Sequence, residues 1–144
     1  MSEKKFDVVN KAKHYNMHPS GVEAIEVCRE LDFNLGNCFK YVFRYTGKEP
    51  VRSLKSALWY FQDHRAHLWG RFVWPNMITI SHKLSNIAKH ETDPLVSEFY
   101  VYFQNYLTHH TSESARDVIG SLQALVAREE NSVQLIAVDR SGAE

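Results

Sequence analysis

The sequence predicts an all-α protein, a compact bundle of about five to six helices in one domain. Apolar residues recur at helical spacing in one segment after another, and a proline or a polar capping residue precedes several of these segments. No internal repeat or low-complexity tract interrupts them. With 144 residues and 44% apolar content, the chain can build a hydrophobic core without a metal or a disulfide.

The first two helices are expected to follow each other closely. The first should begin at Pro19 or Ser20, because the residue before a proline is biased away from helix. The second should begin at an Asn34 N-cap and run through Tyr45. The positions expected to face the core are Val22, Ile25, Cys28 and Leu31 in the first helix and Leu35, Phe39, Val42 and Phe43 in the second.

A short connection should join the second helix to a third that runs antiparallel to it. Gly47 is expected to end the second helix in a left-handed cap, and Pro50 suits the first turn of the third. Residues 67–76 hold a glycine, a proline and two tryptophans, which predicts a loop packed on the bundle. The core positions expected in the third helix are Leu54, Ala57, Leu58 and Phe61.

Three more helices are expected in the second half of the chain. One should cover 77–90, the next should start at Asp93-Pro94, and the last at Ser112. Residues 134–138 are apolar and predict either a short strand or a subunit contact, and 139–144 should be loose. The expected core positions are Leu95, Phe99, Phe103 and Tyr106, followed by Val118, Ile119, Leu122, Leu125 and Val126.

The domain organisation and the compartment follow from composition. Residues 1–13 read as a flexible polar arm, 14–132 as one helical domain and 133–144 as a C-terminal tail. The two cysteines form no CxxC motif and are expected to be buried thiols in a reducing compartment. No run is long and apolar enough to cross a bilayer, so a soluble cytoplasmic protein without membrane contact is expected.

The net charge of the chain limits the classes of partner that it is expected to bind. Seventeen basic and seventeen acidic residues cancel, which disfavours duplex nucleic acid as the main partner. Any anion site must therefore be local. The aromatic segments 59–61 and 99–103 carry rings on all sides, which favours burial against several neighbours and a homo-oligomer.

The sharpest local feature is a row of cations at four-residue intervals: Lys40, Arg44 and Lys48. Positions four apart share a helix face, so these side chains should form one positive stripe. The helix start around residues 34–37 should add free backbone N–H groups, and together they would suit a phosphate. The alternative is a solvated basic face paired with Glu23, Glu26 or Glu30.

Other residues offer weaker signals. Glu23 and Glu26 lie three apart, so they could hold Mg²⁺ or take a proton, although such acidic pairs are common on ordinary surfaces. His14 and His18 flank Tyr15, where a histidine could carry a proton and a tyrosine could stack on a base. Tyr41 and Tyr45 could stack on a base as well, with helix packing as the alternative.

Several familiar sites are not indicated. His64 with His67, and His109 with His110, have no carboxylate that completes a zinc pattern. The sequence has no GxxxxGK[ST], GxGxxG or GxSxG motif, so a Walker-type phosphate loop is excluded.

Three segments in succession resemble a known family. The segments lie within residues 14–64 and read HYNMHPSGVEAIEV, FNLGNCFKYVFRYTGK and SLKSALWYFQDH. They are similar to a small phage-encoded family, whose pattern is HY, then GIEAIE, then F-x-x-GN-x-x-KY-x-x-R-x-G-x-K, then L-x-KA-x-(W/F)Y. It is typified by the nucleotide kinase of lytic coliphages, which acts on deoxynucleoside monophosphates without a Walker motif. The chain departs from it at Arg44-Tyr45-Thr46-Gly47, one residue longer than Arg-Ala-Gly, and residues 65–132 lie outside it as a helical elaboration.

The resemblance implies a phage nucleotide kinase that works in the infected bacterial cytoplasm. A nucleoside triphosphate would be the phosphoryl donor, with Mg²⁺ as the expected metal. An all-α nucleoside triphosphate pyrophosphohydrolase and a non-catalytic module that binds a nucleotide or a host protein are the alternatives. The resemblance suggests Lys40, Arg44, Glu23 and His14 as catalytic residues, Tyr15, Gly36, Asn37, Tyr41, Lys48 and Lys55 as nucleotide ligands, and Glu23 and Glu26 as metal ligands.

Overall fold

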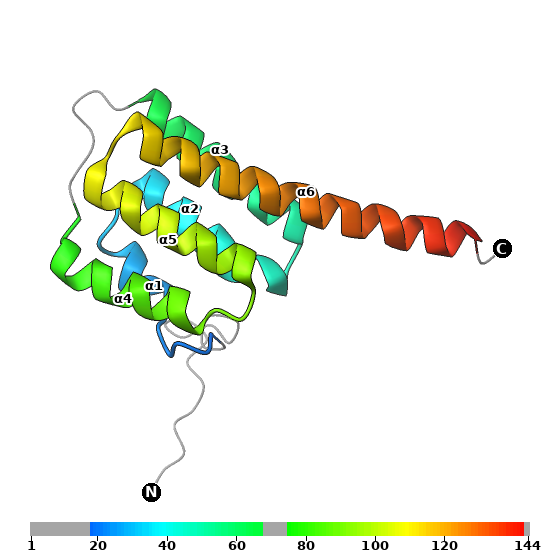
Figure 1. The fold of residues 1–144 in the computed structure, drawn as a ribbon, viewed down its shortest axis with the longest axis horizontal. Helices are drawn as coiled ribbons and strands as arrows, with labels where there is room; N and C mark the ends of the chain where they lie inside the picture. Colours follow the sequence, from blue (N-terminus) through cyan, green and yellow to red (C-terminus); the bar gives the residue numbers. More distant parts are fainter. Residues whose placement is uncertain (1–17, 68–74, 143–144) are drawn as a thin grey trace, which may run out of the picture.

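The computed structural model describes residues 18–67 and 75–142. Across these ranges the chain forms six α-helices and one short 3₁₀ helix, and no strand (Figure 1). The expected all-α bundle is confirmed. The elements are α1 (Ala24–Cys28), α2 (Phe33–Arg44), η2 (Tyr45–Gly47), α3 (Pro50–Ala66), α4 (Met77–His90), α5 (Pro94–His109) and α6 (Ser112–Gly142).

The bundle joins the two halves of the chain. α2 packs on α3, α4 on α5 and α5 on α6, and α3 also packs on α6. Short α1 contacts α2 and α4. The core between these helices is rich in aromatic rings, because a large flat side chain removes much apolar area from water. The fully buried rings are those of Phe39, Phe61, Phe99, Tyr100, Phe103 and Tyr106.

The predicted helix starts are right for four helices and wrong for two. As expected, α3, α4, α5 and α6 begin at Pro50, Met77, Pro94 and Ser112. α1 is shorter than predicted and begins only at Ala24. The N-cap of α2 is Asp32 rather than Asn34, because the Asp32 carboxylate accepts a hydrogen bond from the Leu35 N–H at 2.9 Å.

The connection between α2 and α3 also differs from the prediction. The chain stays helical through η2, so it reverses direction after Gly47 and not at Gly47. Glu49 takes the left-handed conformation, with φ of 45°. The expectation of a left-handed Gly47 is therefore wrong. The extra residue noted in the sequence lies in this additional turn.

Most predicted core positions are buried. In α2, α3 and α5 the apolar stripes identified from spacing face inward, with Leu58 and Leu95 half-buried at their edges. The prediction that Ile25 faces the core is wrong, because 48% of this residue is exposed on the short α1. Cys38 is buried and Cys28 half-buried, and both are free thiols. The predicted loop falls largely on 68–74, which lie outside the described residues.

The last helix is longer than expected. α6 continues through residues 134–138, so the strand alternative is wrong, and 139–142 are helical rather than loose. Figure 1 shows its red end running past the rest of the bundle. Val133, Leu135 and Ile136 are more than half exposed there, and a subunit contact at this end remains a prediction. Among the described helices, none is long and apolar enough to cross a membrane.

Candidate functional site

A pocket of about 460 Å³ lies where α2 ends and α3 begins. Its volume is within the range of small-molecule sites. The last turn of α2, the reversal and the first turns of α3 all contribute to it. The residues that line it are Tyr41, Arg44, Gly47, Lys48, Glu49, Arg52, Ser53 and Ser56.

The reversal is held in place by a local hydrogen bond. The Ser53 hydroxyl donates to the Lys48 carbonyl oxygen at 3.0 Å, which ties the first turn of α3 to the chain that precedes it. Glu49, between them, keeps its left-handed conformation, which is unfavourable for a residue with a side chain. Strained backbone of this kind is concentrated at functional sites. The pocket wall is thus formed by a fixed turn.

The pocket carries an excess of positive charge. Arg44, Lys48 and Arg52 are its three cations, and Glu49 is the carboxylate among its lining residues. Arg52 and Glu49 approach only to 3.9 Å, with 81% and 57% of their side chains exposed, and such a pair contributes little. A guanidinium offers two parallel donors to a phosphate, and an ammonium adds a compact charge. The arrangement suits an anionic ligand with several oxygens.

The Tyr41 ring contacts two cations and a second aromatic ring. The Lys40 Nζ lies 5.0 Å and the Arg44 Cζ 4.8 Å from the centroid of the Tyr41 ring. Tyr60 of α3 stacks on the same ring at 5.9 Å between centroids and 12° between planes. Cation–π contacts of this kind favour a fixed guanidinium position. Arg44 is thereby oriented at the edge of the pocket.

The structure brings together Tyr41, Arg44 and Lys48 of the residues suggested from sequence. Lys40 lies beside Tyr41 but does not line the pocket. Lys55 points to α6, where its Nζ pairs with Glu130 at 2.9 Å. His14 and Tyr15 lie outside the described residues.

Two of the N–H groups that were expected to be free at the start of α2 are already hydrogen-bonded. The Asp32 side chain already accepts from the Leu35 N–H, and the Asp32 carbonyl accepts from the Gly36 N–H at 2.8 Å. The Asn37 side chain donates to the Phe33 carbonyl at 2.8 Å. The expectation of free N–H groups is therefore wrong at Leu35 and Gly36. Gly36 is buried and Asn37 half-buried, and neither lines the pocket.

Glu26 has a structural role in this fold. Its carboxylate accepts from the Glu23 N–H at 2.6 Å and pairs with Lys83 of α4 at 3.2 Å. The backbone hydrogen bond from Glu23 lowers the pKa of Glu26 despite partial burial, and Lys83 adds to this. The described residues hold no group of three or more side chains that could bind a metal. Metal binding by Glu23 and Glu26 stays a prediction.

Sequence reasoning missed five pocket residues: Gly47, Glu49, Arg52, Ser53 and Ser56. The spacing of the sequence could have indicated two of these residues. Arg52 and Ser56 continue the four-residue spacing of Lys40, Arg44 and Lys48 across the turn. Pro50 begins a new helix between Lys48 and Arg52, however, and spacing along one helix does not predict how two helices meet.

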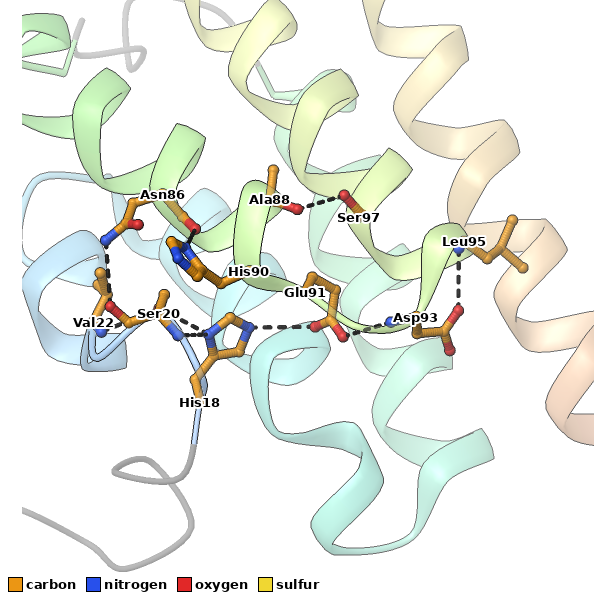
Figure 2. A network of polar contacts seen from close by, with 10 residues as sticks. All are labelled: His18, Ser20, Val22, Asn86, Ala88, His90, Glu91, Asp93, Leu95 and Ser97. Atoms are coloured by element: carbon orange, nitrogen blue, oxygen red, sulfur yellow. Dashed lines mark hydrogen bonds and ion pairs between the residues drawn. The ribbon is translucent and has the colours of Figure 1, made fainter.

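Figure 2 shows a network of polar contacts around the partly buried His18. The His18 Nδ1 accepts from the Ser20 N–H at 3.1 Å, so the proton is on Nε2, which lies 3.3 Å from a Glu91 carboxylate oxygen. The other Glu91 oxygen accepts from the Asp93 N–H at 3.0 Å. Although burial raises the pKa of Glu91, the hydrogen bond from His18 and that from Asp93 keep it below its usual value. His18 also stacks on Phe43, with 5.1 Å between ring centroids.

The network continues into α6. Arg128 donates to both Asp93 carboxylate oxygens, at 3.0 and 2.6 Å, and to the Tyr45 hydroxyl at 3.0 Å. Burial raises the pKa of Tyr45 to about 12, so its hydroxyl stays protonated. His18 thus connects the segment before α1 to the α4–α5 turn and to Phe43 of α2. Arg128 connects α6 to the same turn and to Tyr45 of η2.

A second buried cluster joins the start of α2 to the ends of α3 and α5. The His64 Nε2 lies 2.7 Å from the Tyr106 hydroxyl, and the His64 Nδ1 lies 3.7 Å from an Asp32 oxygen. Arg65 donates to the same Tyr106 hydroxyl at 3.3 Å. Burial lowers the pKa of His64 to about 4, although Asp32 opposes the shift. His64 is therefore neutral at pH 7.

This cluster predicts that acid weakens the fold. The unfolded chain protonates His64 near its ordinary pKa of 6.5, whereas the folded chain does so only near 4. Stability conferred by neutral His64 is thus present above pH 6.5 and is lost as the pH falls toward 4. We expect urea unfolding to show a loss on the order of 1–3 kcal/mol between pH 7 and pH 4.5. His64→Gln should flatten this dependence, and parallel curves for the two proteins would contradict the assignment.

The pocket lies within a segment that matches a known family. Residues 9–62 match the family described as a protein of unknown function, DUF3310. They include α1, α2 and η2, most of α3, and every residue that lines the pocket. The match covers nearly the same residues as the resemblance at 14–64, and its description assigns no activity. No curated protein and no solved structure matches the chain.

Proposed function

We propose that this protein is a phage nucleotide kinase that transfers a phosphoryl group from a nucleoside triphosphate to a (deoxy)nucleoside monophosphate. The observation that carries the proposal is the pocket in which Arg44, Lys48 and Arg52 converge beside two serine hydroxyls. The family resemblance, which rests on the same segment, supports the choice of nucleotides over other phosphates. The phosphates would lie against these three cations.

Phosphoryl transfer needs mainly alignment and charge neutralisation. An oxygen of the acceptor phosphate forms a bond to the γ-phosphorus of the donor, and the bond from that phosphorus to the bridging oxygen breaks. Arg44 and Arg52 would neutralise the charge that spreads over the transferred group, and Lys48 would hold the leaving diphosphate. The Ser56 hydroxyl would donate to the same oxygens, while the Ser53 hydroxyl keeps its hydrogen bond to the Lys48 carbonyl. His14 remains the candidate proton carrier.

Mg²⁺ would bind in this pocket only if the nucleotide phosphates supplied some of its ligands. Magnesium is usually bound by one or two carboxylates together with substrate phosphates. Glu49 is the carboxylate among the lining residues, so it would provide the protein ligand, in place of Glu23 and Glu26. The ion would supply charge neutralisation on the donor phosphates when bound.

The pyrophosphohydrolase alternative has less support. Such an enzyme holds its metal with several carboxylates on helices, whereas one carboxylate lines this pocket and Glu26 is paired with Lys83. A non-catalytic nucleotide-binding module would need the same cations, so only product analysis separates it from a kinase.

The test is an incubation of the purified protein with deoxynucleoside monophosphates and a nucleoside triphosphate, with and without Mg²⁺. Ion-exchange chromatography resolves the products. We expect nucleoside diphosphates from both donor and acceptor in the presence of Mg²⁺. Released pyrophosphate would instead establish the hydrolase, and nucleotides that bind but return unchanged would establish the binding module.

A further inference from the structure

A row of exposed aromatic rings leads away from the pocket along the outer face of α2 and α3. Phe33 is 75% exposed and Trp59 is 58% exposed, which is unusual for side chains of this size. Both contact Tyr60 edge-on, with 5.9 Å between the centroids of Phe33 and Tyr60 and 5.1 Å between those of Trp59 and Tyr60. Each ring is therefore held by a neighbour while part of it faces water.

The row is continuous with the cations of the pocket. Tyr60 stacks on Tyr41, and Lys40 and Arg44 lie against the Tyr41 ring. Phe33 and Arg44 are the two ends of α2, and at 1.5 Å per residue they are about 17 Å apart along its axis. Aromatic rings thus occupy one end of this face, and positive charge the other.

This combination matches the chemistry of one ligand class. Single-stranded nucleic acids bind where bases stack on aromatic side chains and a positive surface follows the phosphates. A mononucleotide in the pocket would leave Phe33 uncovered, because Phe33 lies about 17 Å from Arg44 along the axis of α2. Among the ion pairs of the described residues, none involves Lys40 or Lys48, so both ammonium groups remain available to phosphates.

We propose that the α2–α3 face binds single-stranded nucleic acid, with a phosphate in the pocket and successive bases on Trp59 and Phe33. This goes beyond the proposed kinase, because it requires no turnover. It agrees with the zero net charge of the chain, which disfavours a duplex partner but leaves this face locally positive. DNA and RNA share the bases and phosphates that such a face would contact, so both are tested.

The experiment measures binding of fluorescein-labelled dT₁₂ and rU₁₂ to the full chain by fluorescence anisotropy. Trp59→Ala and Phe33→Ala should each weaken binding about five- to 150-fold, the range for loss of one stacked base. Trp59→Phe should retain most of the affinity. Ile78→Ala is the matched control, because Ile78 is 90% exposed on α4, away from this face.

Salt dependence provides a second measurement. With Lys40, Arg44, Lys48 and Arg52 on phosphates, the logarithm of the binding constant should fall with the logarithm of salt concentration at a slope of about −2 to −3. Lys40→Ala should make that slope shallower by about 0.7. A labelled duplex of equal length should bind more weakly than either single strand.

The outcomes are distinct from those of the kinase test. If Trp59→Ala and Phe33→Ala lose the oligonucleotide but keep wild-type production of nucleoside diphosphates, both proposals stand. Absence of oligonucleotide binding, or equal binding by Trp59→Ala and Ile78→Ala, overturns the inference whatever the kinase result. A change from dimer to monomer in light scattering on these substitutions, without oligonucleotide binding, would assign the face to a protein partner instead.

Discussion

Replacing Arg44 with alanine is expected to lower production of nucleoside diphosphates by at least about 100-fold, the scale of one lost donor to a transition-state charge. Arg44 lines the pocket and is oriented by the Tyr41 ring, so its guanidinium would meet the transferred group in a fixed position. Arg44→Lys should recover only part of the rate, because an ammonium cannot form the two parallel hydrogen bonds of a guanidinium. Steady-state rates of diphosphate formation measure the effect.

The control for this experiment is Arg116→Ala, which removes an exposed arginine of α6 that does not line the pocket. It should leave the rate unchanged, and circular dichroism should show the same helix content in all three variants. Lys40→Ala should have a smaller effect than Arg44→Ala, since Lys40 lies outside the pocket lining. Wild-type turnover by Arg44→Ala would remove the pocket from the mechanism.

The second large effect is expected in the core. Phe103→Ala should destabilise the fold by about 3–5 kcal/mol, which is a large part of the stability of a typical domain. Phe103 is fully buried on α5, and it stacks on Phe99 at 5.4 Å and on Phe39 of α2 at 6.3 Å between centroids. Its removal would leave a cavity between the two halves of the bundle. The midpoint of urea unfolding, at unchanged slope, measures the loss.

The matched control is Val101→Ala on the same helix. Val101 is 52% exposed, so its truncation should change the free energy of unfolding by no more than about 0.5 kcal/mol. Phe103→Leu should fall between the two, because leucine refills part of the space. A loss below about 1 kcal/mol for Phe103→Ala would mean that the packing of α5 on α2 is not as described.

Local signals in the sequence determined the fold class and most helix boundaries. α4 begins at Met77 and ends at His90 as predicted, and Pro50 and Pro94 begin their helices, because a proline restricts the backbone of its own residue and its neighbour. The buried stripes of α2 and α5 followed from spacing alone. The N-cap of α2 was predicted at Asn34 and lies at Asp32, since the side chain of either residue can accept a helix N–H and spacing does not distinguish them.

For the candidate site, the sequence by itself determined that Lys40, Arg44 and Lys48 follow one another at the spacing of a helix face, within a segment that resembles a family. Only the tertiary structure decided which of them share a pocket. The packing of α3 on α2 brings Arg52 and Ser56 to the same pocket as Arg44, and Lys48, in the reversal after η2, lines it as well. Spacing describes one helix, whereas a pocket depends on the reversal between two helices and on the buried contacts that fix it.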